Sequence, residues 1–403
     1  MTIRIPKLTA EHFFKMFFIL FWGQDILFSY IRGTFLRIPY IKYIANYIFP
    51  VLMVICLVLA LPYIAKAITK SDIIFFAIVT GVFVLHIFIF PSNAQGLISI
   101  AGSFFALILP MYFIGLRFDV DEHLHLIYII SIINIWAFAI YTFISGDSTT
   151  VDQSGYASFM NRAYILLTQL LIVIGFSFKK FNVINIVTSI IGFLFLLMCG
   201  NRGSVLILLL FILIYILLIT DKKRRIALCA GILVVSVVIA LYFEIIVGAL
   251  MVVFTQLGMS TRIFERLLEG TFMFSQGRDV ISEALWAAIL KNPVFGYGLA
   301  SDRVIAGSYA HNYAVELWVS FGLFIGSVIL IATLFLIIRA WLVTKEKSSK
   351  IFLLTLICIG FLKLFITNSF LEEGMFFMLL GVCVTQLRQY KFNKLRSVLH
   401  ESL

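Results

Sequence analysis

Arginine, histidine and carboxylate side chains gather in one stretch of the chain, between Ser275 and Asn312. Arg278 lies near the start of this stretch, and His311 lies at its end, next to Asn312. An arginine guanidinium stays charged and forms paired hydrogen bonds that match a phosphate or diphosphate. A histidine near neutral pH takes a proton from an attacking hydroxyl group. These residue types therefore predict an anion-binding group and a general base in the same segment.

The wider polar segment, 248–312, carries balanced charges. Its five cationic and five acidic residues are Arg262, Arg266, Arg278, Lys291, Arg303, Glu265, Glu269, Asp279, Glu283 and Asp302. Balanced charge is more typical of a structured site than of a polybasic lipid-binding tail. Charges three and four residues apart predict a short helix over 262–269. The amphipathic residues 279–290 predict a second helix along the membrane surface, ending near Asn292. The glycines at 296 and 298 predict a tight turn.

A second arginine, Arg202, lies elsewhere in the sequence, between two glycines at the start of an apolar run. A further helix is predicted to begin near Tyr313, directly after the polar segment. Helix N-termini offer free N–H groups and the positive end of a dipole, and together with an arginine they favour an anion such as a phosphate. Glu316 lies near the same helix start as His311. We expect it to orient or charge-stabilise the imidazole, or to serve as the base itself.

The elements that must position these residues are membrane-spanning helices. Of the 403 residues, 62% are apolar and only 13% are charged, and the mean hydropathy is +1.08. So few charges cannot cover a soluble surface. Apolar runs long enough to cross the hydrocarbon core recur along the chain, without the alternation of a membrane β-barrel. The runs centre on 12–31, 44–64, 72–90, 96–116, 125–144, 163–178, 182–199, 204–220, 226–247, 313–338, 351–368 and 373–387. We therefore expect an all-α polytopic membrane protein with about twelve transmembrane helices in a single domain over 1–403.

Charge distribution predicts the orientation in the membrane. Basic residues cluster in alternate loops and at the C-terminal end, and the net charge is +11. By the positive-inside rule these loops face the cytoplasm, so the basic excess is a topology signal and predicts no nucleic-acid partner. The large loop over 248–312, between the ninth and tenth helices, then lies outside, which in a bacterium is the periplasmic face of the inner membrane. Arg32, Arg37 and Lys42 oppose this orientation if the first apolar run spans the membrane, which the sequence leaves open.

Simpler roles compete with these assignments. An outer arginine alone is more often a membrane anchor or an ion-pair partner, and a lone histidine is more often structural. A transporter for lipid-linked oligosaccharides would place polar groups near the bilayer midplane, where Lys363 is the best candidate. A scaffold protein has no need for arginines, a histidine and two helix N-termini at one membrane edge. The clustering at one edge favours an enzyme.

Five short motifs follow one another along the chain. They are Asn201-Arg202-Gly203, Gly277-Arg278, Asn292 to Gly298, His311-Asn312, and Glu316 to Gly322. In this combination they resemble the O-antigen ligase and O-antigen polymerase superfamily, the membrane glycosyltransferases of bacterial surface polysaccharide assembly. The number of predicted spans and the place of the large loop are also similar to that family.

The resemblance implies transfer of a glycan from an undecaprenyl diphosphate carrier to a sugar hydroxyl, with inversion and without a metal or another cofactor. Arg202 and Arg278 would bind the diphosphate leaving group, and His311 would be the catalytic histidine and general base. No cluster of Asp, Glu and His side chains in the sequence suggests a dedicated metal site. We also expect substrate-binding roles for a set of side chains near the outer face, namely Arg162, Arg262, Arg266, Arg303, Asn312 and Glu316.

The acceptor of the glycan is the least determined part of this prediction. A polymerase hands the glycan to the next carrier-linked O-antigen repeat unit, whereas a ligase hands it to the lipid A core of lipopolysaccharide. The sequence, rich in Phe and Ile, and its short outer loops are closer to the polymerases, so we expect a polymerase, with a ligase as the alternative. Expected partners are the lipid-linked donor, the glycan acceptor and membrane lipids. A chain-length regulator is a further partner that the sequence leaves open.

Overall fold

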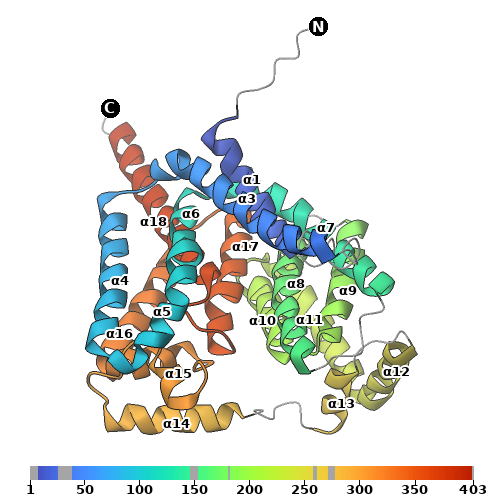
Figure 1. Cartoon of the computed structure of the whole chain (residues 1–403). Helices are drawn as coiled ribbons and strands as arrows, with labels where there is room; N and C mark the ends of the chain where they lie inside the picture. The colour runs from blue at the N-terminus through green and yellow to red at the C-terminus, as the bar shows by residue number, and fades with distance from the viewer. Residues whose placement is uncertain are drawn as a thin grey trace. The chain divides into compact units, whose positions relative to one another are not determined.

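The computed structural model describes residues 8–25, 39–145, 153–179, 182–256, 261–270 and 277–401. Every regular element among these residues is a helix, which confirms the predicted all-α class (Figure 1). The end of the first apolar run, residues 26–31, and the cationic residues Arg32 and Arg37 lie outside the described residues. The stretch that was expected to hold the site is described from Gly277 onward.

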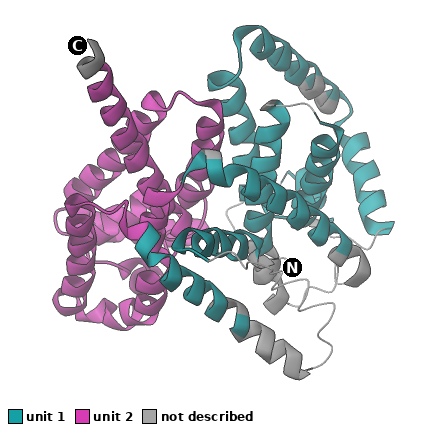
Figure 2. Ribbon diagram, turned by 90° about the horizontal axis from the view of Figure 1, so that it is seen from above, with its two compact units in different colours: residues 1–63, 119–273 teal, residues 64–118, 274–403 magenta. Residues whose placement is uncertain are grey.

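The chain divides into two compact units, which Figure 2 shows in different colours. Unit 1 comprises residues 1–63 and 119–273, and unit 2 comprises residues 64–118 and 274–403. Arg202 therefore belongs to unit 1, whereas Arg278 and His311 belong to unit 2. The single membrane domain expected over 1–403 remains a prediction.

Unit 1 consists of nine described helices, most of which are apolar. They are α1 (Ala10–Asp25), α3 (Pro39–Ala65), α7 (Val120–Ser145), α8 (Gln153–Lys179), α9 (Val183–Met198), α10 (Arg202–Leu218), α11 (Lys222–Leu241), α12 (Phe243–Gln256) and α13 (Arg262–Leu268). Helix α13 confirms the short helix predicted over 262–269. The predicted large loop was expected to begin at residue 248. In the structure the helical backbone breaks at Tyr242 (φ −115°, ψ 23°) and then continues as α12 to Gln256, because the sequence stays apolar there.

Unit 2 contains the helices that surround the candidate site. They are α4 (Lys70–Ile89), η2 (Pro91–Asn93), α5 (Ala94–Ser103), η3 (Phe104–Ile108), α6 (Pro110–Arg117), α14 (Arg278–Lys291), α15 (Ser301–Ala306), α16 (Tyr313–Val343), α17 (Lys347–Leu356), η4 (Ile357–Phe361), η5 (Leu362–Phe365) and α18 (Gly374–Glu401). Helix α14 lies crosswise to α4 and α16 at one end of this unit (Figure 1). Its bounds confirm the amphipathic helix predicted over 279–290.

Five described helical segments are long and apolar enough to cross a membrane. They are Lys70–Ile89, Pro91–Arg117, Glu122–Ile140, Tyr313–Val343 and Lys347–Phe365. Shorter apolar helices cover Val51–Ala65, Arg162–Phe178, Val183–Met198, Arg202–Leu218 and Phe243–Gln256. A helix of n residues rises about 1.5 Å per residue, so a span needs about 20 residues. The structure thus supports an all-α multi-pass membrane protein, and the count of about twelve spans remains a prediction.

The two ends of unit 2 differ in chemistry. At the Lys70 end of α4, the buried Asp72 accepts a hydrogen bond from the hydroxyl of Tyr112 at 2.6 Å and forms an ion pair with Arg388 at 2.8 Å. This network connects α4, α6 and α18, because a buried carboxylate must be paired and hydrogen-bonded. The opposite end of α4 meets η2 and the polypeptide that follows α14, where the candidate site lies.

Candidate active site

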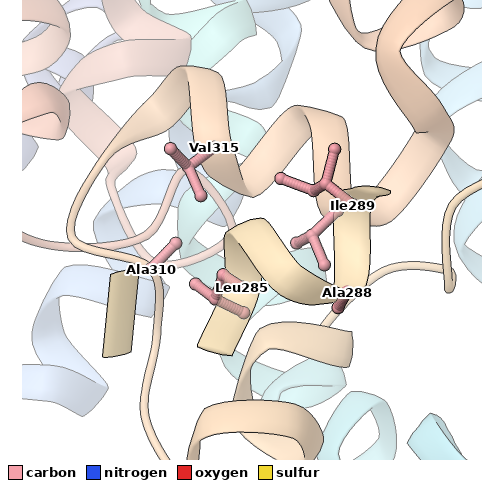
Figure 3. Packing of buried hydrophobic residues seen from close by; sticks show 6 residues of the cluster. Leu285, Ala288, Ile289, Ala310 and Val315 are labelled. Carbon is pink, nitrogen blue, oxygen red and sulfur yellow. The ribbon is translucent and has the colours of Figure 1, made fainter. Parts of the chain in front are cut away.

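The apolar face of helix α14 packs against the region around the start of α16, and this packing positions Arg278, the first residue of α14. Leu285, Ala288 and Ile289 are buried against Ala310, which precedes α16, and Val315 in its first turn (Figure 3). Their spacing of three, four and one residues puts them on one side of the helix. Immediately before α14, the backbone at Gly277 has a φ of 85°, a left-handed conformation that glycine adopts without a steric penalty. This explains why glycine precedes Arg278.

The segment after α14 interlocks with a break in α16. At Gly322 the backbone leaves the helical conformation (φ 77°, ψ 168°), although α16 continues on both sides. The N–H groups of Tyr297 and Gly298 donate to the carbonyls of Val319 and Ser320 at 2.8 and 2.9 Å. These backbone bonds use carbonyls that the break in α16 leaves without their usual helical partners. A Cβ atom at Gly322 would lie 2.1 Å from the carbonyl oxygen of Val294, so only glycine fits there.

The predicted glycine turn is confirmed and has additional supports. Gly296 and Gly298 have φ values of 67° and 87°. Asn93 donates from its side-chain amide to the carbonyls of Tyr297 and Leu299 at 2.7 and 3.1 Å. Leu299 donates its N–H to Nδ1 of His86 at 2.8 Å. Both His86 and Asn93 lie more than 200 residues earlier in the chain, and nothing in the sequence pattern indicated that they support this turn.

His311 lies in a strained and partly buried turn. Its φ is 53°, which is uncommon for a residue with a side chain and often marks a functional site. Its ring packs against that of Tyr309 in a tilted arrangement, with ring centroids 4.1 Å apart and an interplanar angle of 47°. Nδ1 of His311 is buried and has no hydrogen-bond partner among the described residues. Burial, together with the positive charge of Arg278, lowers the pKa of His311 to about 4. The imidazole is therefore neutral at neutral pH and able to accept a proton.

Arg278 lies at the surface of unit 2, near enough to His311 for its charge to affect the pKa of the imidazole. Its guanidinium donates to the carbonyl of Ile366 at 2.8 Å, and its charge acts on His311. The side-chain hydroxyl oxygens of Tyr309 and of Thr367, the residue after Ile366, lie 3.5 Å apart. The side chain of Arg278 is exposed, so most of its donor groups face outward. The structure thus brings together the two residues in unit 2 that were predicted to perform the chemistry.

A buried carboxylate holds the backbone next to His311. Asp302 is 0% exposed and accepts a hydrogen bond from the N–H of Ala310 at 2.9 Å. Its other oxygen forms an ion pair with Arg303 at 3.2 Å, and Arg303 continues to Glu372 at 3.1 Å. Burial raises the pKa of the Asp302 carboxyl, while the charge of Arg303 opposes this rise. Arg303, predicted to bind substrate, is thus an ion-pair partner that joins α15 to the 366–373 segment.

Glu316 does not contact His311 as the sequence suggested. It is 1% exposed. One carboxylate oxygen accepts from the hydroxyl of Ser369, and the other accepts from the N–H of Phe370 at 3.3 Å. Glu316 therefore holds the 362–373 segment, through Ser369 and Phe370, and does not orient the imidazole of His311. Asn312, another predicted substrate-binding residue, caps α16 by accepting from the N–H groups of Ala314 and Val315 at 3.0 and 3.3 Å.

The 362–373 segment is a third part of the site that sequence reasoning did not assign. It supplies the carbonyl bound by Arg278 and the partners of Arg303 and Glu316. Lys363 forms an ion pair with the buried Glu373 at 2.5 Å, and Asn368 donates to the same carboxylate at 2.9 Å. The signal in the sequence was Lys363, a charged residue within an apolar run, which a transporter would place near the bilayer midplane. In the structure this charge is paired.

Four predicted arginines lie in unit 1. Arg202 is the first residue of α10, which Asn201 caps by accepting from the N–H of Ser204 at 3.2 Å. Arg162 lies in α8, and its charge acts on the buried thiol of Cys199, three residues before Arg202. Both therefore lie at the same end of unit 1. Arg266 lies in α13, and Arg262 begins that helix, with a side chain outside the described part. That these four arginines bind substrate together with Arg278 remains a prediction.

These features define an all-α, multi-pass membrane protein with an arginine, a neutral histidine and two buried carboxylates at one end of its helices. Residues 187–331 match the family model described as O-antigen ligase. This segment contains Arg202, Arg278 and His311. The match confirms the resemblance to the O-antigen ligase and polymerase superfamily that the motifs predicted. No curated protein and no solved structure matches the chain.

Proposed function

We propose that the protein is a membrane glycosyltransferase that moves a glycan from an undecaprenyl diphosphate carrier to a sugar hydroxyl. The observation that carries this proposal is that Arg278 donates to the carbonyl of Ile366, next to Thr367, while the ring of His311 packs against Tyr309, whose hydroxyl lies 3.5 Å from Thr367. Burial and the charge of Arg278 lower the pKa of His311 to about 4. Both lie within the segment that matches the O-antigen ligase family. A cation next to a neutral base is the combination that displacement of a diphosphate by a hydroxyl requires.

The leaving group is the part of the reaction that needs positive charge. When the anomeric C–O bond breaks, the diphosphate takes both bonding electrons and gains negative charge. Fixed cations that face this developing charge lower the barrier, and loss of one such donor typically costs about a hundred- to a thousand-fold in rate. Arg278 is the described candidate in unit 2, because its guanidinium is exposed and held by Ile366. Arg202 is the proposed second cation.

The acceptor hydroxyl is activated by His311. The neutral imidazole takes the hydroxyl proton while the oxygen attacks the anomeric carbon from the side opposite the diphosphate. One C–O bond forms as the other breaks, so the configuration inverts. Tyr309 and the bond from Ala310 to Asp302 hold the imidazole in place during this transfer. A general base of this kind contributes about a hundred- to ten-thousand-fold in rate.

The acceptor that we propose is the next carrier-linked O-antigen repeat unit, which makes the protein a polymerase at the periplasmic face of the inner membrane. Transfer to the lipid A core is the alternative. A transporter is disfavoured because Lys363, the residue that best suited that function, forms an ion pair with Glu373. Asn368 donates to the same carboxylate. The charge of Lys363 thus stabilises the 362–373 segment.

The decisive experiment is deletion of the gene followed by electrophoresis of the lipopolysaccharide. We expect a lipid A core that bears one repeat unit, because single units are still ligated when polymerisation stops. A bare core with accumulated carrier-linked polymer would instead identify a ligase. Accumulation of carrier-linked repeat units on the cytoplasmic side would identify a transporter and overturn the enzyme assignment.

A further inference from the structure

A groove of about 480 Å³ lies at the far end of α16, away from the candidate site. Its walls come from residues 343–349, which connect α16 to α17, and from residues 386–397, in the second half of α18. Ligand pockets commonly measure about 300–1,000 Å³, so the groove is large enough for a small molecule. The basic loops predict that this end of unit 2 faces the cytoplasm. The groove is thus separate from the proposed glycan chemistry.

The α18 wall of the groove is one side of a helix that is fixed from its other side. The lining residues of α18 recur every three or four positions, which places them on a single side of the helix. They are Gln386, Gln389, Tyr390, Asn393, Lys394 and Ser397. On the other side of α18, Arg388 forms an ion pair with the buried Asp72 of α4 at 2.8 Å. Thr344, within the other wall, donates from its hydroxyl to Gln386 at 3.2 Å. The groove is therefore formed before any ligand binds.

The lining offers hydrogen-bond donors that the protein itself does not use. Within the described part of the chain, the ammonium groups of Lys345 and Lys394 form no ion pair, and the side-chain amides of Gln389 and Asn393 form no hydrogen bond. Glu346, the acidic lining residue, already accepts from the hydroxyl of Ser349 at 3.0 Å. A phosphate offers negative charge and several acceptor oxygens to such donors. The lining therefore favours a phosphate-bearing anion.

Positive charge surrounds the groove. Residues 339–350 and 386–397 together contain eight cationic residues and one acidic residue, Glu346. Basic pockets at the cytoplasmic side of membrane helices bind anionic lipid head groups. The positive-inside rule requires cations at this end of the helices, but it does not require a groove lined by unpaired ones. The groove is thus more than a topology signal.

The groove adjoins an apolar surface that is suited to lipid. Leu342 is 68% exposed and directly precedes the lining residue Val343, at the end of a helix that is long and apolar enough to cross a membrane. On the second half of α18, Phe392 and Leu395 are 66% and 57% exposed and lie three residues apart, on one side of the helix. Acyl chains would remove such side chains from water, whereas a soluble anion would not. The border of the groove therefore favours a phosphate that is attached to acyl chains.

We propose that this groove binds an anionic phospholipid of the cytoplasmic leaflet. Lys345 and Lys394 bind its phosphate, the amides of Gln389 and Asn393 bind its ester or glycerol oxygens, and its acyl chains cover Leu342. The bound lipid joins the connection between α16 and α17 to α18. This assignment does not depend on the proposed reaction, because no residue of the candidate site lines the groove.

Native mass spectrometry of the full chain in detergent tests this proposal, with phosphatidylglycerol as the anionic probe. Phosphatidylcholine has similar chains but no net charge, and glycerol phosphate has the phosphate but no chains. We expect one phosphatidylglycerol to bind more tightly than phosphatidylcholine, and glycerol phosphate to bind more weakly than either lipid. Equal binding of the two lipids would overturn the proposal, because the groove would then not select a negative charge. Binding of glycerol phosphate as tight as that of phosphatidylglycerol would assign the groove to a soluble phosphate and overturn the lipid assignment.

Two double variants with the same net charge locate the binding. Lys345→Gln combined with Lys394→Gln should weaken binding of phosphatidylglycerol about 25-fold, since each lysine near an anionic head group contributes about fivefold. Lys347→Gln combined with Lys391→Gln is the matched control, because both lysines lie in the same two segments but outside the lining. We expect the control to change binding less than about twofold. Equal weakening in both double variants would assign the binding to general surface charge and overturn the proposal.

A further variant pair fills the groove at constant charge. Asn393 lines the groove, so Asn393→Trp occupies part of it. Phe392 is the neighbouring residue on the same helix and lies outside the lining, so Phe392→Trp is the control. We expect Asn393→Trp to lose the bound phosphatidylglycerol and Phe392→Trp to retain it, with the same thermal unfolding temperature for both variants in the absence of lipid. Retention of the lipid by Asn393→Trp would show that it binds elsewhere.

Discussion

The side chain of Asp302 accepts a hydrogen bond from the backbone N–H of Ala310 at 2.9 Å, one residue before His311. Asp302 is fully buried, and His311 has a left-handed backbone with a φ of 53°. A non-glycine residue persists in such a conformation only when its surroundings hold it there. Asp302 supplies that support, and through Arg303 it also joins the turn to Glu372. The position of the proposed base thus depends on a residue that does not touch it.

Asp302→Ala should destabilise the protein and slow glycan transfer. The substitution leaves the buried N–H of Ala310 without a partner, which costs about 1–3 kcal/mol. Thermal unfolding in detergent and a transfer assay measure the two effects. Glu372→Gln is the matched control, because Glu372 is 37% exposed and an exposed ion pair contributes at most about 1 kcal/mol. Equal losses in both variants would show that Asp302 has no special role in the turn.

Replacement of the proposed base should abolish activity without loss of the protein. We expect His311→Ala to reduce glycan transfer by about a hundred- to ten-thousand-fold, the usual contribution of a general base. In cells this appears as loss of long-chain glycan on a lipopolysaccharide gel, with unchanged protein in the membrane fraction. A normal chain-length ladder from this variant would remove His311 from the mechanism.

The two arginines should not tolerate lysine. A lysine keeps the charge but lacks the planar pair of donors that fits a diphosphate. Arg278→Lys and Arg202→Lys should each lower transfer about ten- to a hundredfold, the effect of a lost hydrogen bond to a charged group. Complementation of a gene deletion with each variant gives the measurement. Full activity of Arg202→Lys would reduce that residue to a membrane anchor.

The pH dependence of transfer should lack a limb at the usual histidine pKa. Because the pKa of His311 is lowered to about 4, the imidazole stays neutral, and active as a base, until the pH falls to that value. We expect kcat/KM to change little between about pH 5 and 8 on account of this group. Removal of the positive charge in Arg278→Gln should raise the pKa of His311, which a titration of its ring signals by NMR would detect. An acid limb near the ordinary pKa of histidine in the unmodified enzyme would contradict this environment.

Gly322→Ala should disturb the packing of the 292–298 segment against the break in α16. The new Cβ would lie 2.1 Å from the carbonyl oxygen of Val294, and φ at this position is 77°. The expected loss of stability is more than about 1 kcal/mol, since neither feature suits alanine. Gly81→Ala is the control in the same unit. A Cβ there meets nothing within 4 Å, and alanine in a helix is favourable by up to about 1 kcal/mol. Comparable thermal stability of the two variants would show that the break adapts to a side chain.

Several parts of this architecture follow from the sequence because they depend on neighbours along the chain. The all-α membrane class follows from long apolar runs, and the bounds of α14 follow from its amphipathic period and from Asn292. The start of α16 follows from the capping side chain of Asn312. The positions of Arg278 and His311 at the ends of these elements were therefore predictable. The family resemblance added their roles, which composition and spacing do not determine.

The supports of the site were decided only by tertiary structure. Arg278 donates to a carbonyl 88 residues away, and Glu316 accepts from a hydroxyl 53 residues away. The sequence suggested that Glu316 orients His311, because the two lie five residues apart. In the folded unit that carboxylate turns to Ser369 and Phe370 instead. Local pattern determines which segments become helices and where they begin. The partner of a buried polar group depends on which distant backbone the apolar faces bring beside it, and that is settled only when the helices pack.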